Sequence, residues 1–190
     1  MRVQVVALIC CACCAVAWSQ SGDSVGREPS PMEAFAGGTG VHAVWSKEIT
    51  RYGTTAVVTA IVLEDSSQPA QKMRGVRVDL AAGGAHDQIF LDEEATERTR
   101  AAMVEINDAV ARRGIPGNGN GCMGAREFWP LYSWAWNKYH ELNVDYCGGP
   151  GAYALVLHGR GRDNEFRLAG ADPTSLASTL ATALDELRQH

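Results

Sequence analysis

Residues 75–91 read GVRVDLAAGGAHDQIFL and contain the clearest local pattern in the chain. Apolar and polar side chains alternate strictly from Val76 to Leu80, as expected for a strand with one buried face. Gly83 and Gly84 supply a tight turn, and residues 88–91 return as a second strand. The stretch therefore predicts a β-hairpin.

The segments on either side of the hairpin extend it into a larger unit. Residues 54–63 (TTAVVTAIVL) are rich in β-branched side chains and predict another strand. Downstream, Asp92 can accept hydrogen bonds from the amides of a helix's first turn, and Gly114 can end the helix. One face of this predicted helix carries residues at helical spacing, namely Thr99, Met103, Ile106 and Val110.

The second half of the chain has the same order of patterns. Residues 152–157 and 165–168 predict two strands, and Asp172–Pro173 opens a helix whose apolar face runs from Leu176 to Leu187. A shift of 77 residues superposes the halves without a gap, placing Leu80 on Leu157. We therefore predict an α+β fold of pseudo-duplicated strand–hairpin–helix units, about (βββα)2, with an antiparallel sheet packed against two helices.

The first 40 residues predict export rather than folded structure. Residues 1–19 combine Arg2, an apolar run and small residues before a polar stretch, which is the pattern of a signal peptide. Lipidation of a leader cysteine and a retained anchor are the alternatives. Residues 20–40 predict a flexible linker, and 41–190 a single α+β domain with halves 41–114 and 122–190. We expect a secreted or periplasmic protein.

The expected compartment decides whether the cysteines are predicted to form disulfides. Four of the six lie in the predicted leader, so the mature chain keeps only Cys122 and Cys147. Two cysteines in an oxidising compartment predict a disulfide, here closing a loop of about 25 residues. A metal site or a reactive thiol is the alternative, but neither cysteine belongs to a Cys-x-x-Cys or Cys/His cluster. We expect no metal and no cofactor.

Charge narrows the range of partners. The formal net charge is −5 at pH 7, and the sequence contains no basic run. We therefore expect no nucleic-acid partner, and membrane contact only if the leader is retained or lipidated. The sequence leaves the oligomeric state open.

Aromatic residues concentrate in residues 128–139. Tyr132, Trp134 and Trp136 alternate and would share one face of a strand, while Trp129 precedes a proline and is expected near an edge or turn. Exposed ring faces would form a platform for a sugar, a flat ligand or a partner's apolar surface. The alternative is that these rings belong to the core.

The histidines form no recognisable catalytic motif. His140 with Asp145 or Glu141 is the best sequence-based acid–base pair for a hydrolase, although strand alternation separates their side chains. His86 and His158 are expected to be surface turn residues. We therefore expect a secreted or periplasmic non-enzymatic binding module, with Trp129, Tyr132, Trp134 and Trp136 as candidate ligand-binding residues. Its ligand could be a glycan, a small apolar molecule or a secreted protein; a hydrolase and a structural or assembly component are the alternatives.

Overall fold

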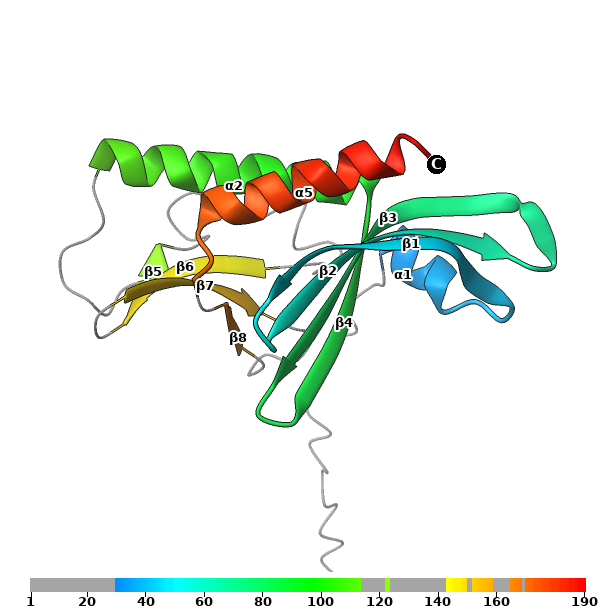
Figure 1. Cartoon of the computed structure of the whole chain (residues 1–190), viewed down its shortest axis with the longest axis horizontal. Coiled ribbons are helices and arrows are strands. Elements are labelled where there is room, and N and C mark those ends of the chain that lie inside the picture. Colours follow the sequence, from blue (N-terminus) through cyan, green and yellow to red (C-terminus); the bar gives the residue numbers. More distant parts are fainter. Residues whose placement is uncertain (1–29, 114–121, 124–142, 150–151, 159–164, 169) are drawn as a thin grey trace, which may run out of the picture.

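The computed structural model describes residues 30–113, 122–123, 143–149, 152–158, 165–168 and 170–190. Two antiparallel sheets lie beneath a layer of two helices (Figure 1). The first sheet has the order β1 (Val41–Tyr52), β2 (Ala56–Asp65), β3 (Gln68–Ala82) and β4 (Ala85–Asp92). The second has the order β5 (Cys122–Met123), β6 (Asn143–Gly149), β7 (Ala152–His158) and β8 (Glu165–Leu168). The α+β class is therefore confirmed.

The first sheet contains the hairpin that the sequence predicts. Strands β3 and β4 pair Val78 with Ile89 and Ala82 with Ala85, which leaves Gly83 and Gly84 as a two-residue turn. Both glycines have positive φ, 55° and 87°, a requirement of the turn that matches the twist of paired strands. The predicted alternation of residues 76–80 is confirmed, because Val76, Val78 and Leu80 are all buried on one face.

Two long helices cover the buried faces of the sheets. Helix α2 (Glu93–Arg113) begins at Asp92, whose Oδ1 accepts a hydrogen bond from the Ala95 amide at 2.7 Å. Helix α5 (Pro173–Leu187) begins at Asp172, which forms a capping box with Ser175. Both predicted helix starts are therefore confirmed, and each carboxylate satisfies an amide that the helix leaves unpaired.

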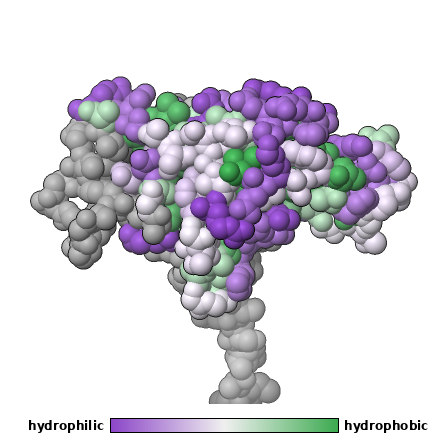
Figure 2. Space-filling model, in the orientation of Figure 1, coloured by the Kyte–Doolittle hydropathy of each residue, from purple (hydrophilic) through white to green (hydrophobic). Residues whose placement is uncertain are grey.

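The two helices lie side by side and run in opposite directions (Figure 1). Near one end of the pair, Thr174 Oγ1 donates to Asn107 Oδ1 at 3.0 Å. Their facing sides enter a core shared with both sheets, which includes Met103, Ile106, Leu180, Leu187, Val78, Ile89, Leu155 and Phe166. The tops of the helices are predominantly hydrophilic (Figure 2). Among the described residues, no helix is long and apolar enough to cross a membrane.

The predicted linker is wrong over part of its length. Residues 31–36 form helix α1 (Pro31–Ala36), which begins with a capping box between Ser30 and Glu33. Met32 is completely buried and packs with Ile61 and Leu63 on the face of the first sheet opposite to α2 and α5. The Ser-, Gly- and Pro-rich composition of this stretch is typical of a linker. The burial of a single side chain, Met32, holds the short helix against the sheet. The expectations for residues 1–29 lie outside the described residues.

The gap-free superposition of the two halves does not agree with the strand pairing. The hairpin β3–β4 pairs Val78 with Ile89, whereas β7–β8 pairs Leu157 with Phe166. A shift of 77 carries Ile89 to Phe166 but carries Val78 to Leu155, whereas the structure pairs Phe166 with Leu157. With Ile89 matched to Phe166, the second hairpin is therefore two residues shorter, and the shift of 77 fails for β7. Each sheet also contains four strands where the prediction has three.

Candidate functional site

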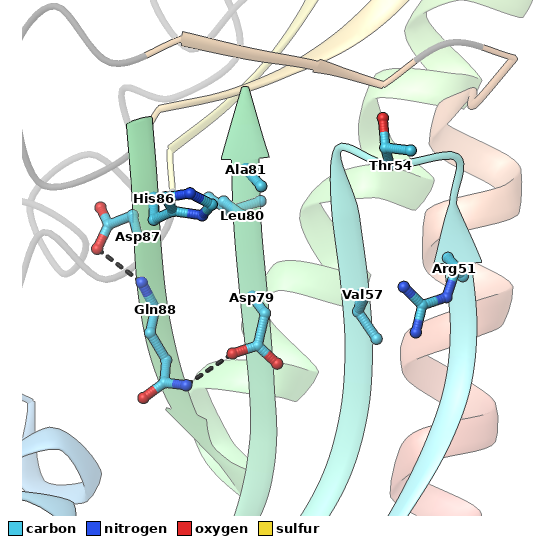
Figure 3. Close-up of a pocket in the computed structure, with 9 residues that line it drawn as sticks. All are labelled: Arg51, Thr54, Val57, Asp79, Leu80, Ala81, His86, Asp87 and Gln88. Atoms are coloured by element: carbon cyan, nitrogen blue, oxygen red, sulfur yellow. Dashed lines mark hydrogen bonds between the residues drawn. The ribbon is translucent and has the colours of Figure 1, made fainter. Parts of the chain in front are cut away.

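A groove of about 580 Å³ lies on the face of the first sheet that is turned away from the helices. Figure 3 shows Arg51, Val57, Asp79 and Gln88 in front of the strands, with α2 and α5 behind. Leu80 borders the groove from the strand, although its side chain is buried in the core on the helix side. The lining residues come from all four strands and the β1–β2 turn: Arg51, Thr54, Val57, Asp79, Leu80, Ala81, His86, Asp87 and Gln88. Its volume falls within the range of small-molecule sites, about 300–1,000 Å³, but the groove is shallow and open to solvent rather than enclosed.

Strand register assembles the centre of the groove. Arg51 lies opposite Val57, Val57 opposite Asp79, and Asp79 opposite Gln88. Adjacent strands are about 4.8 Å apart, so these four residues form one row straight across the sheet. The row combines a guanidinium, a carboxylate and a carboxamide with one apolar side chain.

The two hairpin turns set one end of the groove. The Ala81 amide donates to the Thr55 carbonyl at 2.8 Å, which continues the β2–β3 pairing toward the β1–β2 turn. Gly53 has a φ of 55° in that turn, a conformation that costs glycine little. Thr54 and His86 therefore lie at the same end of the sheet.

Asp79 is the centre of the polar network in the groove. Its Oδ2 accepts from Arg77 Nε at 2.9 Å, and its Oδ1 accepts from Gln88 Nε2 at 2.6 Å (Figure 3 shows the second bond). The backbone N–H of Gln88 also donates to Asp87 Oδ1 at 2.8 Å. Both oxygens of Asp79 are thus engaged, which fixes the carboxylate and the Gln88 carboxamide relative to each other.

Arg51 supplies a second oriented group. Its Nη2 and Nε donate to the two oxygens of Glu48 at 2.7 and 3.2 Å. The hydrogen bond with Glu48, followed by the attraction of its charge, raises the pKa of Arg51 above its ordinary value. The guanidinium therefore stays protonated and exposed, held by a bidentate pair at the edge of the groove.

Helix α1 occupies the other end of the same sheet face. Phe90 lies two residues beyond Gln88 on β4 and packs against the cluster of Met32, Ile61 and Leu63. Ser30 Oγ also donates to the Phe90 carbonyl at 3.3 Å. The helix covers the apolar end of this face and leaves the polar end as the groove.

The sequence-predicted ligand-binding residues Trp129, Tyr132, Trp134 and Trp136 lie outside the described residues, as do His140 and Glu141. The backbone of Asp145 is in β6, opposite Val156. Cys122 and Cys147 lie directly opposite each other across β5 and β6.

None of the groove residues was predicted as a site from the sequence. His86, expected to be a surface turn residue, is exposed but lies in strand β4 rather than in the turn. Asp79 and Gln88 are outward-facing residues of the predicted hairpin, so their alternation was the available signal. That signal could not show that Arg51 and Val57 share their row, because the register of β1 and β2 follows from no local motif.

The groove presents guanidinium, carboxylate, carboxamide and imidazole groups. Among the described residues, no hydroxyl group hydrogen-bonds to His86, and no three His, Cys, Asp or Glu side chains gather as a metal site. Its groups can instead donate and accept hydrogen bonds from fixed positions. No family model matches the chain, and neither a curated protein nor a solved structure matches it.

Proposed function

We propose that the protein is a non-enzymatic binding module that acts outside the cytoplasm and holds a small, neutral, hydroxyl-rich ligand, a saccharide, in the groove of the first sheet. The observation that carries the proposal is the row of Arg51, Val57, Asp79 and Gln88 across four strands. It offers oriented donors and acceptors beside an apolar surface, on a rigid sheet rather than on loops.

The pairing of charges supports a neutral ligand. Arg51 is compensated by Glu48, and Asp79 is compensated by Arg77 at 2.9 Å. A charged ligand would compete with a partner already in place, whereas hydroxyl groups can add to the remaining donor and acceptor positions of the same groups. The apolar surface of Val57 would face the C–H side of a sugar ring.

Binding is favoured over hydrolysis by the arrangement of the polar groups. A general base has to reach the proton that it removes, and a nucleophile has to lie within hydrogen-bond distance of that base. Both oxygens of Asp79 accept hydrogen bonds from Arg77 and Gln88. This carboxylate is therefore organised to hold a position in the network.

The duplicated (βββα)2 plan remains part of the proposal. Its support is that α2 and α5 each follow an antiparallel sheet whose strands pair in chain order. The helices also bury residues 77 apart, such as Met103 with Leu180 and Ile106 with Ala183. A two-residue deletion in the second hairpin would reconcile this match with the strand register.

The proposed function is tested by isothermal titration with neutral disaccharides (maltose, cellobiose and diacetylchitobiose), an acidic peptide and a small apolar molecule. We expect saturable binding of a disaccharide, weakened about tenfold or more by Arg51→Ala, because hydrogen bonds to charged groups contribute about 1.5–3 kcal/mol. Arg188→Ala is the matched control, since Arg188 also forms an exposed ion pair three residues away, with Asp185 at 2.7 Å. Binding of only the peptide or the apolar molecule, or equal effects of both variants, would contradict the proposal.

A further inference from the structure

The backbone of the second sheet places two cysteines face to face. Strands β5 and β6 pair antiparallel with Cys122 opposite Cys147 and Met123 opposite Tyr146. Directly opposed residues of an antiparallel pair have Cα atoms about 4.5–5.5 Å apart. A disulfide spans Cα separations of about 4.4–6.8 Å, so the spacing of directly opposed positions is compatible with a bridge.

Strand β5 is the shortest strand that the structure describes. It contains two residues, lies at the edge of the second sheet and pairs with β6. So short a ladder offers few hydrogen bonds, and an isolated two-stranded pairing is marginal even at full length. A disulfide between the paired residues would hold β5 to β6, where the hydrogen bonds of a two-residue strand are few.

We propose that Cys122 and Cys147 form a cross-strand disulfide that fastens the edge strand β5 to β6. In its formation the two thiols lose two protons and two electrons, and a disulfide oxidant accepts them and becomes two thiols. The bridge closes a loop of about 25 residues, which restricts the unfolded chain. Because the bridge would lie within the β5–β6 ladder, the attachment of β5 to the second sheet would depend on oxidation.

The bridge also fixes both ends of one chain segment. In the sequence, residues 124–142 connect Met123, the end of β5, with Asn143, the start of β6. This segment carries Trp129, Tyr132, Trp134 and Trp136, the aromatic residues that the sequence singles out. The inference does not depend on the proposed saccharide, because the groove lies on the first sheet.

Peptide mapping of the full chain tests the pairing. Free thiols are alkylated at low pH before digestion with trypsin without reduction, so that exchange is prevented. Cleavage after Arg113, Arg126, Lys138 and Arg160 places Cys122 in residues 114–126 and Cys147 in residues 139–160. We expect these two peptides as one linked species that separates on reduction. Alkylation of both cysteines without reduction, or linkage of either to the leader peptide, would overturn the proposal.

A second measurement tests the mechanical role. Reduction should lower the melting temperature of the wild-type protein by roughly 6–12 °C. It should have no such effect on the Cys122→Ser/Cys147→Ser variant, whose melting temperature should match that of reduced wild type. An equal response of both proteins to reduction would show that the bridge does not stabilise this edge.

Discussion

The hydroxyl of Tyr52 on β1 lies 2.9 Å from Thr179 Oγ1 on α5, although the two residues are 127 positions apart in the chain. Thr179 Oγ1 in turn lies 3.3 Å from Thr50 Oγ1. Further along the same strand, Lys47 Nζ contacts Glu186 Oε1 at 2.8 Å. The edge strand β1 is thus joined to α5 by polar contacts, and these position one side of the sheet that carries the groove.

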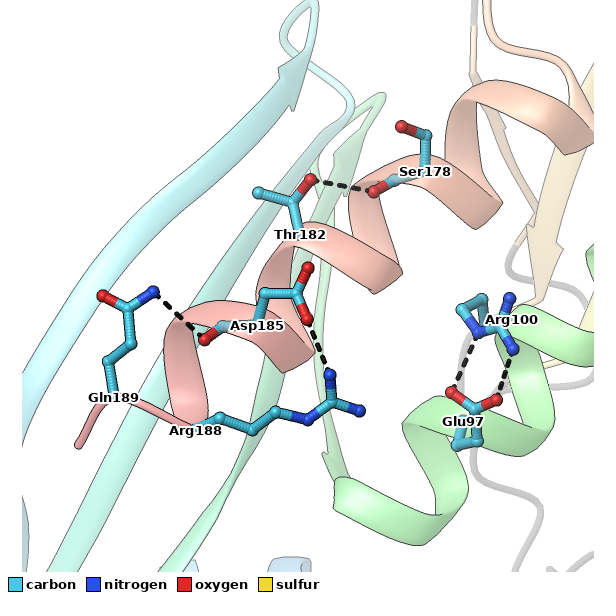
Figure 4. Close-up of polar contacts among 7 residues, drawn as sticks. All are labelled: Glu97, Arg100, Ser178, Thr182, Asp185, Arg188 and Gln189. Carbon is cyan, nitrogen blue, oxygen red and sulfur yellow. Dashed lines mark hydrogen bonds and ion pairs between the residues drawn. The ribbon is translucent and has the colours of Figure 1, made fainter.

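Removing the Tyr52 hydroxyl should weaken this connection. Tyr52→Phe keeps the ring and deletes the contact with Thr179, so we expect a loss of about 1 kcal/mol in the free energy of unfolding in urea. Thr182→Val is the control, because Thr182 Oγ1 is exposed and donates only to the Ser178 carbonyl within α5 (Figure 4). An equally small effect of both variants would show that the hydroxyl adds nothing to stability.

Tyr52 also predicts a change of stability at alkaline pH. Burial raises the pKa of Tyr52 above its ordinary value of 10.0, while the hydrogen bond with Thr179 opposes that shift. A raised pKa means that the contribution of this group is fully present below pH 10 and is lost as the pH rises through the folded-state value. Wild type should therefore lose stability faster above pH 10 than Tyr52→Phe. Parallel curves for the two proteins would contradict the assignment.

Gly75 makes room for helix α1 on the outer face of the first sheet. A Cβ at this position would overlap the Leu91 carbonyl oxygen and Met32 Sδ. Since the Leu91 backbone belongs to the neighbouring strand, we expect Gly75→Ala to reduce the free energy of unfolding by about 2 kcal/mol or more. Gly37→Ala is the control, because a Cβ there meets only ordinary contacts, the nearest being Glu33 O at 3.4 Å. Similar stability of the two variants would contradict the close packing of Gly75 against Leu91 and Met32.

Charged pairs on the helices should matter much less than these contacts. Figure 4 shows Glu97 with Arg100 on α2 and Asp185 with Arg188 on α5. The hydrogen bonds from Arg100 hold the pKa of Glu97 below its ordinary value, with a smaller contribution from the charge of Arg188. The Asp185–Arg188 pair is largely exposed, so we expect Arg188→Ala to change stability by less than about 1 kcal/mol, which suits its use as a control.

The aromatic segment makes a separate prediction from the sequence. If Trp134 and Trp136 form an exposed platform, replacing either by phenylalanine should remove a red-shifted emission that acrylamide quenches. If both belong to the core, the lost signals should be blue-shifted and protected from quenching. The second result would remove the predicted aromatic ligand surface and leave the groove as the proposed site.

The parts of the fold that were predictable have strong local patterns. The hairpin of residues 75–91 shows strict alternation around two glycines, and both long helices begin at an aspartate with capping geometry. Helix α1 was missed although Ser30, Pro31 and Glu33 form a local helix-start pattern. Only its burial depends on contacts with residues far away in sequence, Ile61 and Leu63. The groove could not be predicted for a similar reason, since it depends on the register of four strands.

The most direct test of the proposed function is to map a saccharide onto the structure by the backbone amide signals of the isotope-labelled protein. On titration with the disaccharide that binds most tightly, we predict shifts at Arg51, Val57, Asp79 and Gln88, with the exposed ends of α2 and α5 unchanged. Saturable binding with no shift at these four residues would contradict the assignment of the groove as the ligand site. Shifts confined to the segment 128–139 would transfer the function to the aromatic residues.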